Sequence, residues 1–268
     1  MYSIGFIGIG SIGTALAKAA AKSLPGEQIL LSNRTPEKAK NLAAILGCKA
    51  GSNIDAANEC KYILLSVKPQ MMAGMLEEIA PVLKARKSGF VLVTPAAGLA
   101  ISRIQQLAGG QYPVIRIMPN TPCAVGSGTV LCTRNSSVTG ADYDEFKQIL
   151  GGAGTFIDLH ESLIDAGSAI SGCGPAYVFT FIEAMADAGV ACGLTRSDAL
   201  KLASSTVLGS ADLAIKSGAH PAQLRDKVCS PGGSTIEGVL SLENDGFRAA
   251  VANCVIAAFE KTKELGNN

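Results

Sequence analysis

The chain has 268 residues, of which 48% are hydrophobic and only 17% charged, and its net charge at pH 7 is +1. This length allows one large domain or two modest ones with a substantial core. Because the charge is nearly balanced, neither nucleic acid nor an acidic membrane surface is indicated as a partner. So few charged residues, with 30 glycines, predict helices that are buried at subunit contacts.

The cysteines and histidines argue against a disulfide-bonded secreted protein and against a metalloprotein. The eight cysteines are scattered and form no C-x-x-C pair, which predicts free thiols in a reduced, cytoplasmic compartment. The two histidines, His160 and His220, are far apart, so no metal site is expected. The sequence shows no signal peptide and no apolar run near the ~18 residues of a membrane span, so no membrane association is expected.

The first predicted strand, residues 3–8, runs directly into a glycine turn and a helix over residues 11–23. Gly8, Gly10 and Gly13 follow the G-x-G-x-x-G pattern of dinucleotide-binding proteins. We expect Gly8 to make the tight turn, Gly10 to let the backbone approach a diphosphate, and Gly13 to let the helix pack on the strand. A glycine-rich turn without a ligand is the alternative, but the strand and alanine-rich helix around the motif favour a nucleotide site.

The second predicted strand, residues 28–32, indicates which dinucleotide binds. NAD sites usually have an acidic residue here for the ribose 2′-hydroxyl. This chain has Ser32, Asn33, Arg34 and Thr35 instead, and a guanidinium with hydroxyls suits a 2′-phosphate. We therefore predict a preference for NADP(H) and leave NAD(H) open. Alternatively, Thr35 only caps the next helix and Arg34 is solvated.

Strand and helix patterns alternate over the first 160 residues, and strand patterns are absent afterwards. This order predicts an α/β fold: a Rossmann-type, doubly wound, mostly parallel sheet over residues 1–160 that binds NADP, then an all-α dimerisation and substrate-binding domain over residues 161–268. A self-contained monomeric bundle is the alternative for the helical part. The further predicted strands are 61–67, 89–94, 113–118, 127–133 and 154–158, and the further helices in this part are 36–46, 53–60, 70–84, 100–108 and 141–151.

The helical part is predicted to contain four long helices. The first begins near Pro175 and ends at Gly193, and the second begins after Thr195 and ends before Gly218. The last two extend over residues 230–243 and 245–265. A shorter helix ends near Ser171 and links the two parts.

Several polar loops lie where the predicted strands or helices meet. Residues 66–69, 94–98 and 118–122 follow strands, at the edge of a parallel sheet where ligands bind. Residues 230–235 place two glycines and three hydroxyls at a helix start, a geometry that binds a carboxylate through free N–H groups. Thr235 would add a neutral hydroxyl beside the reacting atom. Each loop taken singly could also be an ordinary connection.

The sequence shows no His–Asp pair, no Cys–His pair and no metal cluster. Hydride transfer to an electrophilic centre such as a protonated imine needs none of these groups, because the nicotinamide carries the chemistry. This combination of motifs resembles the pyrroline-5-carboxylate reductase family over nearly the whole chain. The resemblance rests on residues 8–13, 32–35, 67–69, 96–98, 118–122, 171–177, 220–224 and 230–235.

The resemblance implies reduction of 1-pyrroline-5-carboxylate to L-proline with NAD(P)H, the last step of proline synthesis, by a homodimer that often forms a ring of dimers. It implies that the partner's helices help to close the site and that Thr235 hydrogen-bonds the substrate's ring nitrogen as the catalytic residue. The implied substrate-binding residues are Ser230, Gly232, Gly233, Ser234 and Thr235. The cofactor-binding residues predicted from the motifs and the resemblance are Gly8, Ile9, Gly10, Ser11, Ile12, Gly13, Ser32, Asn33, Arg34, Thr35, Asn53, Val67, Lys68, Pro69, Ala96, Ala97 and Asn120.

Two positions depart from the family pattern. Cys173 stands where serine is common. The stretch before His220 lacks an acidic residue that some members carry, so no carboxylate is assigned as the general acid. The proton is expected to come from solvent or from an already protonated imine. A β-hydroxyacid dehydrogenase is disfavoured, because residues 171–193 contain no lysine. Another NADP-dependent imine reductase and a non-catalytic NADPH sensor remain as alternatives.

Overall fold

The computed structural model describes residues 1–266. The chain divides into two compact units, one formed by residues 1–173 with the end of the chain from residue 258, and one formed by residues 174–257. The sequence predicted the boundary at residue 160, whereas the compact units divide after residue 173. The difference arises because the helix α7 (Ile164–Ser171) groups with the first unit.

The first unit contains one sheet in the order β3-β2-β1-β4-β5-β6-β7-β8. All neighbouring strands are parallel except β6 and β7, which confirms the predicted mostly parallel sheet. Only a short 3₁₀ turn joins β6 to β7, and a parallel pair would need a longer crossover. The strands are β1 (Tyr2–Ile7), β2 (Ile29–Ser32), β3 (Lys49–Ala50), β4 (Cys60–Leu65), β5 (Val91–Thr94), β6 (Val114–Pro119), β7 (Gly128–Arg134) and β8 (Gly154–Asp158).

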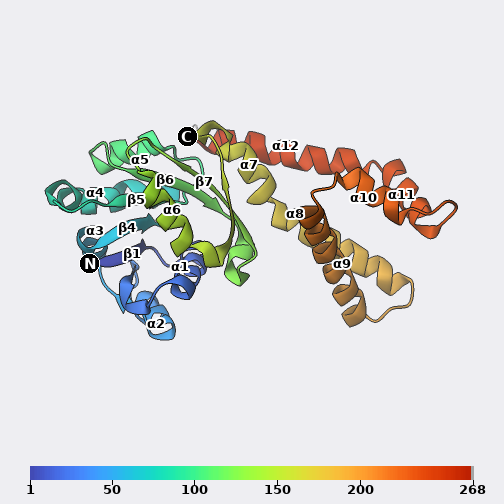
Figure 1. Cartoon of the computed structure of the whole chain (residues 1–268), viewed down its shortest axis with the longest axis horizontal. Coiled ribbons are helices and arrows are strands. Elements are labelled where there is room, and N and C mark those ends of the chain that lie inside the picture. The colour runs from blue at the N-terminus through green and yellow to red at the C-terminus, as the bar shows by residue number, and fades with distance from the viewer. Residues whose placement is uncertain (267–268) are drawn as a thin grey trace. The chain divides into compact units, whose positions relative to one another are not determined.

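Helices cover both faces of this sheet, as predicted (Figure 1). Successive strand residues point to opposite faces, so Phe6 packs in the cluster with α1, α2 and α6, and Ile7 packs in the cluster with α3, α4 and α5. The two-residue strand β3 was not predicted, because an exposed pair such as Lys49–Ala50 has no strand pattern. The helices are α1 (Ser11–Ser23), α2 (Pro36–Leu46), α3 (Asn53–Glu59), α4 (Pro69–Ala85), α5 (Ile101–Ala108) and α6 (Gly140–Ile149).

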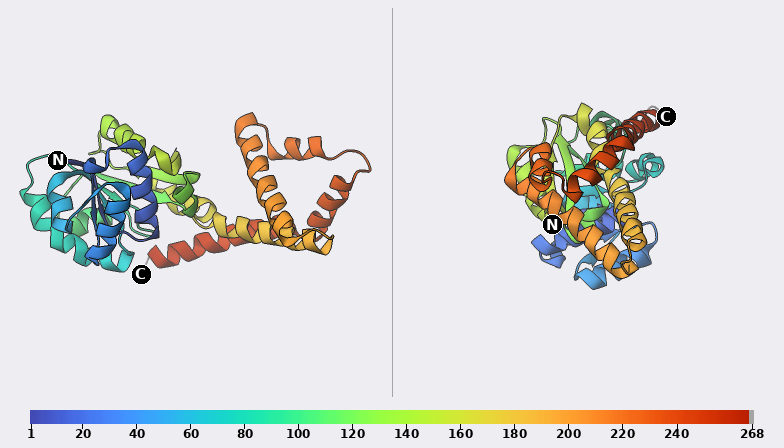
Figure 2. Two further views of the ribbon diagram at one scale, coloured as in Figure 1. Left: turned by 90° about the horizontal axis from the view of Figure 1, so that it is seen from below. Right: turned by 90° about the vertical axis from the view of Figure 1, so that its right-hand side faces the viewer.

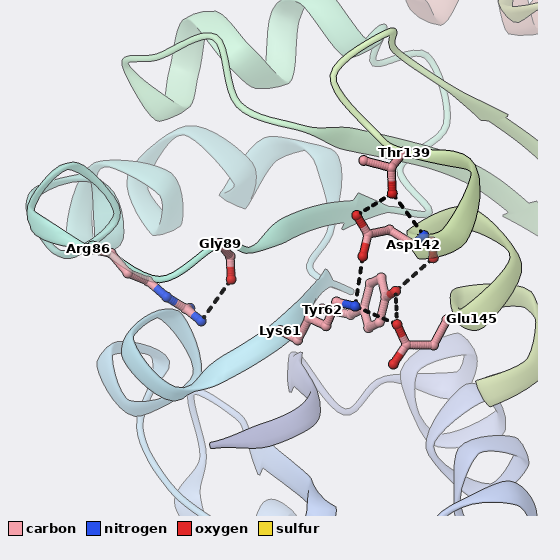
Figure 3. Close-up of polar contacts among 7 residues, drawn as sticks. All are labelled: Lys61, Tyr62, Arg86, Gly89, Thr139, Asp142 and Glu145. Carbon is pink, nitrogen blue, oxygen red and sulfur yellow. Dashed lines mark hydrogen bonds and ion pairs between the residues drawn. The ribbon is translucent and has the colours of Figure 1, made fainter.

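A polar cluster joins the amino end of β4 to α6 (Figure 3). Lys61 forms an ion pair with Asp142 at 2.7 Å and a second one with Glu145. The buried Tyr62 hydroxyl donates to the backbone carbonyl of Asp142 and to the Glu145 carboxylate. Because these groups lie at the amino end of β4, they hold α6 on the sheet and stay away from the carboxyl edge, where ligands bind in such sheets.

The second unit is helical. The helix α10 was not predicted, because it has only eight residues and its cap is the side chain of His220, whose Nδ1 accepts the N–H of Ala222. The helix α11 begins at Ser234 and not at Ser230, because Gly232 adopts φ +67° and Ser230 lies in the preceding turn. The helices of this part are α8 (Gly174–Ala191), α9 (Arg196–Ser217), α10 (Pro221–Val228), α11 (Ser234–Asn244) and the first half of α12 (Phe247–Gly266), whose residues from 258 group with the first unit.

Small residues mediate the packing within the second unit. The helices α8 and α9 pack against each other through Ala186, Ala199 and Ala203, which are buried (Figure 2). Most large apolar side chains of these helices stay exposed, and Leu208 and Ile215 are 71% and 80% exposed. These helices therefore present apolar surface that the single chain does not cover.

One exposed apolar part of the helices could also be a candidate to span a membrane. Residues Glu161–Ala191 form a helical stretch that is long and apolar enough to span one, and its 18-residue apolar window has a mean hydropathy of 1.2 with 11% of the window buried. The sequence has no uninterrupted run of ~18 apolar residues, and this stretch is interrupted by polar residues such as Asp165 and Glu183. A helix that covers another protein surface has the same composition, so the stretch is weak evidence for a membrane.

Candidate functional site: a dinucleotide pocket at the carboxyl edge of the sheet

The strand order reverses at β1, which lies between β2 and β4. In doubly wound sheets ligands bind at such a point, outside the carboxyl ends of the strands. A pocket of about 970 Å³ lies there. It is lined by segments that follow β1, β2 and β4, and by parts of α2, α3 and α4: Ile7–Gly10, Ser32–Pro36, Lys38–Lys40, Ala50–Asn53, Ser66–Lys68, Gln70, Met71, Gly74, Met75 and Glu78.

The geometry of the glycine turn fits a bound dinucleotide. Gly8 adopts φ +105°, and a Cβ there would lie 2.5 Å from the carbonyl oxygen of Ser66. A Cβ on Gly13 would lie 2.3 Å from the carbonyl oxygen of Gly8, so α1 can approach the strand only because this residue is glycine. A Cβ on Gly10 would meet no atom within 4 Å. The lack of a side chain at Gly10 therefore serves no packing and leaves room for a ligand.

The first turn of α1 has free backbone donors. Its N-cap is Gly10, which supplies no side-chain cap. The first N–H groups of a helix lack partners within the helix and attract anions. Ser11, Ile12 and Gly13 lie in this turn, so the structure brings the predicted residues of the glycine motif together at a helix start that has no side-chain cap.

Asn33 ties the glycine turn to the loop after β2. Its Oδ1 accepts the N–H of Ile9 at 3.0 Å, and its Nδ2 donates to the carbonyl of Thr35 at 3.1 Å. Both ends of this carboxamide are therefore engaged within the protein. Asn33 lines the pocket, and its hydrogen bonds hold the two ligand-binding loops in register.

A chain of hydrogen bonds crosses the pocket from β2 to α4. The hydroxyl of Ser32 donates to Oδ1 of Asn53 at 2.7 Å, and Nδ2 of Asn53 donates to the Glu78 carboxylate at 2.8 Å. Asn53 is placed by the start of α3, where Ser52 and Asp55 form a capping box. Hydrogen bonds from the backbone N–H and hydroxyl of Ser52 lower the pKa of Asp55, so this cap is ionised at neutral pH.

The pocket rim is positively charged. Arg34, Lys38 and Lys68 are exposed, line the pocket and have no side-chain partner within residues 1–266. Thr35 is the N-cap residue of α2, and its side chain makes no capping hydrogen bond, so its hydroxyl is available to a ligand. Unpaired cations beside the end of β2 suit a phosphate on the ribose.

Other predicted cofactor residues lie outside this pocket. Ala96 is buried and donates its N–H to Thr94, and Ala97 is exposed. The carboxamide of Asn120 donates to the carbonyl of Ser171 and accepts the N–H of Thr129, so it has a structural role at the end of β6. Pro69 is the first residue of α4 and adjoins the lining residue Lys68.

The predicted substrate residues belong to the second unit. Ser230, Gly232, Ser234 and Thr235 are exposed, and Gly233 is the N-cap of α11 without a side-chain cap. A Cβ on Gly233 would lie 2.5 Å from Oγ of Ser230 and 3.2 Å from its carbonyl oxygen, so a side chain there would displace the Ser230 hydroxyl. The free N–H groups that this segment was predicted to offer are thus present at the start of α11.

Among the polar residues of the pocket, the sequence did not reveal Glu78, and it placed Ser66 in the predicted loop 66–69 without assigning it a role. The hydroxyl of Ser66, beneath the glycine turn, is buried and has no partner within the described residues. Glu78 lies a helical turn beyond Gly74 on the face of α4 that begins at Gln70. Only the spacing of residues 70, 74 and 78, every fourth residue after the loop at Lys68, could have indicated it.

A doubly wound sheet, a glycine turn without side-chain obstruction and a cationic rim define an NADP-dependent oxidoreductase. Residues 3–98 match the family described as NADP oxidoreductase, coenzyme F420-dependent, and residues 161–265 match the family described as pyrroline-5-carboxylate reductase dimerisation. The chain is 40% identical to the pyrroline-5-carboxylate reductase of Pisum sativum, over 98% of this chain and 96% of that one. It is 38% identical to that of Escherichia coli, over 99% and 98%.

Solved structures agree with these relatives. The chain resembles a Plasmodium falciparum pyrroline carboxylate reductase with NADP bound, at a TM-score of 0.87 and 34% identity over 99% of this chain and 98% of that one. It also resembles a pyrroline-5-carboxylate reductase from Coxiella burnetii, at a TM-score of 0.91 and 30% identity over 98% of each chain. The chain belongs to the pyrroline-5-carboxylate reductase family, and the predicted use of NADP(H) is confirmed.

Proposed function

We propose that this protein reduces the cyclic imine of 1-pyrroline-5-carboxylate to L-proline with NADPH. The observation that carries this proposal is the full-length similarity to reductases of that name, together with a pocket that fits NADP(H). NADPH supplies a hydride when it is bound. The imine carbon accepts this hydride, and a proton on the ring nitrogen, from solvent or already present on the imine, completes the amine.

The residues of the first unit would hold the cofactor. The uncapped start of α1 and the open space at Gly10 suit the diphosphate, and Arg34 with Lys38 suits the 2′-phosphate. Val67 and Lys68 extend the same pocket wall beyond β4. The remaining predicted contacts, Ala96, Ala97 and Asn120, are proposed on the family resemblance alone.

The start of α11 would hold the substrate. Its free N–H groups suit the substrate carboxylate, and the exposed hydroxyl of Thr235 in the first turn is available to the ring nitrogen. A neutral hydroxyl accepts a hydrogen bond from a protonated imine without neutralising it. The proton of the imine therefore stays on the nitrogen while the carbon receives the hydride.

We propose a homodimer as the working unit, with further assembly into a ring of dimers and a cytoplasmic location. The match to a dimerisation family and the exposed apolar residues of α9 support the dimer. The eight free cysteines suit a reducing compartment.

The direct test is loss of NADPH absorbance with and without 1-pyrroline-5-carboxylate, with proline identified as the product. Thr235→Ala should lower kcat/KM about tenfold or more, whereas Thr235→Ser, which keeps the hydroxyl, should restore most of it. Unchanged kcat/KM in Thr235→Ala would remove this residue from the reaction. A folded protein that binds NADPH and turns over only other cyclic imines would favour the broader imine reductase, and one that turns over none would favour the sensor.

A further inference from the structure

A carboxylate enters the dinucleotide pocket from α4, at the place where β2 supplies none. Glu78 lines the pocket and accepts a hydrogen bond from Nδ2 of Asn53 at 2.8 Å. Asn53 in turn accepts the hydroxyl proton of Ser32 at 2.7 Å. Ser32 is the last residue of β2, the strand whose end faces the adenosine ribose in sheets of this kind.

The carboxylate fixes the direction of both hydrogen bonds. An ionised carboxylate can only accept, so the amide nitrogen of Asn53 must face Glu78. The amide oxygen of Asn53 then faces Ser32, and the single hydroxyl proton of Ser32 must point to it. As a result, Ser32 has only lone pairs left for a ligand.

This arrangement favours a ribose hydroxyl over a phosphate. The lone pairs of Ser32 accept a hydrogen bond from a 2′-hydroxyl but repel a 2′-phosphate. Arg34, exposed on the same rim without a partner among residues 1–266, acts in the opposite direction and attracts the phosphate. The pocket therefore contains one element that suits NADP(H) and a separate one that suits NAD(H).

We infer that Glu78 is a specificity-determining positioning residue: acting through Asn53 and Ser32, it maintains the binding of NADH beside that of NADPH. The inference rests on the proposed function only in that this pocket is the cofactor site. It replaces the expectation from the sequence that Ser32 is a phosphate donor. Through the hydroxyl of Ser32, Glu78 provides the hydrogen-bond acceptor that other NAD-binding sheets obtain from an acidic residue at the end of β2.

The test is the affinity of the substrate-free protein for each reduced cofactor, followed by nicotinamide fluorescence. In Glu78→Gln the carboxamide can donate as well as accept, so Asn53 can turn and release the hydroxyl of Ser32. We expect the Kd for NADH to rise about fivefold to tenfold, while the Kd for NADPH stays unchanged or falls. Glu77→Gln is the matched control, because Glu77 is the preceding residue of α4, is exposed and does not line the pocket.

An equal change in both affinities, or none, would overturn the inference, since a purely structural role does not distinguish the cofactors. The same selective shift in Glu77→Gln would also overturn it, because the effect would then come from net charge alone. The selective shift in Glu78→Gln only, in a protein that turns over no 1-pyrroline-5-carboxylate, would support this inference and contradict the proposed reaction. The two failures are therefore distinguishable.

Discussion

The two compact units differ in how they bury their apolar side chains. The first unit has a large cluster of buried residues on each face of its sheet, with strand residues such as Phe6 and Ile63 fully buried. The second unit buries only the small residues Ala186, Ala199 and Ala203 as a cluster, while large side chains on α9 stay exposed. The first unit buries its large apolar side chains within itself, whereas the second unit needs another protein surface to cover its exposed apolar side chains.

This difference matches the division of tasks. The lining of the pocket comes entirely from the first unit, so we expect a single chain to bind the cofactor. The proposed substrate segment lies in the second unit, whose exposed helices match a dimerisation family. We therefore expect cofactor binding and catalysis to respond differently to loss of the dimer.

The largest effect is expected from charges on the exposed face of α9. Leu208→Asp with Ile215→Asp should weaken the dimer roughly a thousandfold, because two apolar side chains are lost from the covered surface and two charges are placed there. Sedimentation equilibrium measures this. Ile45→Asp on α2 is the control, since Ile45 is 76% exposed in the first unit and should not change the assembly. A wild-type protein that is monomeric at micromolar concentration would contradict the expectation.

The glycine turn should separate stability from binding. Gly13→Ala should lower the free energy of unfolding by about 1–3 kcal/mol, because the new Cβ would overlap the carbonyl oxygen of Gly8. Gly10→Ala should leave stability unchanged and weaken NADPH binding about tenfold or more, because its Cβ enters open space. Thermal unfolding and a fluorescence titration report the two effects. If Gly10→Ala lowered the free energy of unfolding as much as Gly13→Ala, Gly10 would also be required for packing, which would contradict this account.

Arg34 should discriminate between the cofactors. Arg34→Ala should weaken NADPH binding about tenfold to a hundredfold and leave NADH binding nearly unchanged, because only NADPH has the 2′-phosphate. Lys49→Ala is a matched control, since Lys49 is a nearby exposed cation that does not line the pocket. An equal loss for both cofactors would remove Arg34 from recognition of the phosphate.

The smallest effect concerns acid stability of the cluster in Figure 3. Hydrogen bonds from Lys61 and Thr139 lower the pKa of Asp142. This contribution to stability is present above the unfolded value near 3.8 and is lost as the pH falls through the lower folded value. Asp142→Asn should cost about 0.5–1 kcal/mol at pH 7 and should flatten the loss of stability below pH 4. An unchanged slope of unfolding free energy against pH would contradict this assignment.

The sequence predicted the fold well where residue patterns are long. The helices α1 and α2 have the predicted bounds, because each begins after a glycine or threonine turn and carries a regular apolar stripe. The eight-residue helix α10 was missed, since its cap is a histidine and it buries no residue. The antiparallel pair β6–β7 was not specified, although the lack of a predicted helix between these strands was consistent with it.

The residues of the cofactor pocket were predictable only where they form short continuous segments that follow a strand. The loops after β1, β2 and β4 were found from glycines and hydroxyls beside strand ends, and the pocket brings them together. Glu78 could not be found in this way, because it reaches the pocket from the third turn of α4 and acts through Asn53, 25 residues earlier. Side chains that join a site through another residue leave no local pattern.

One measurement tests most directly the claim that the first unit binds the cofactor alone and the second needs a partner for catalysis. The variant with Leu208→Asp and Ile215→Asp is titrated with NADPH and then assayed for reduction of 1-pyrroline-5-carboxylate, both at concentrations where it is monomeric. The account predicts a Kd for NADPH within about twofold of wild type and a turnover reduced to background. A monomer with full turnover, or one that no longer binds NADPH, would contradict it.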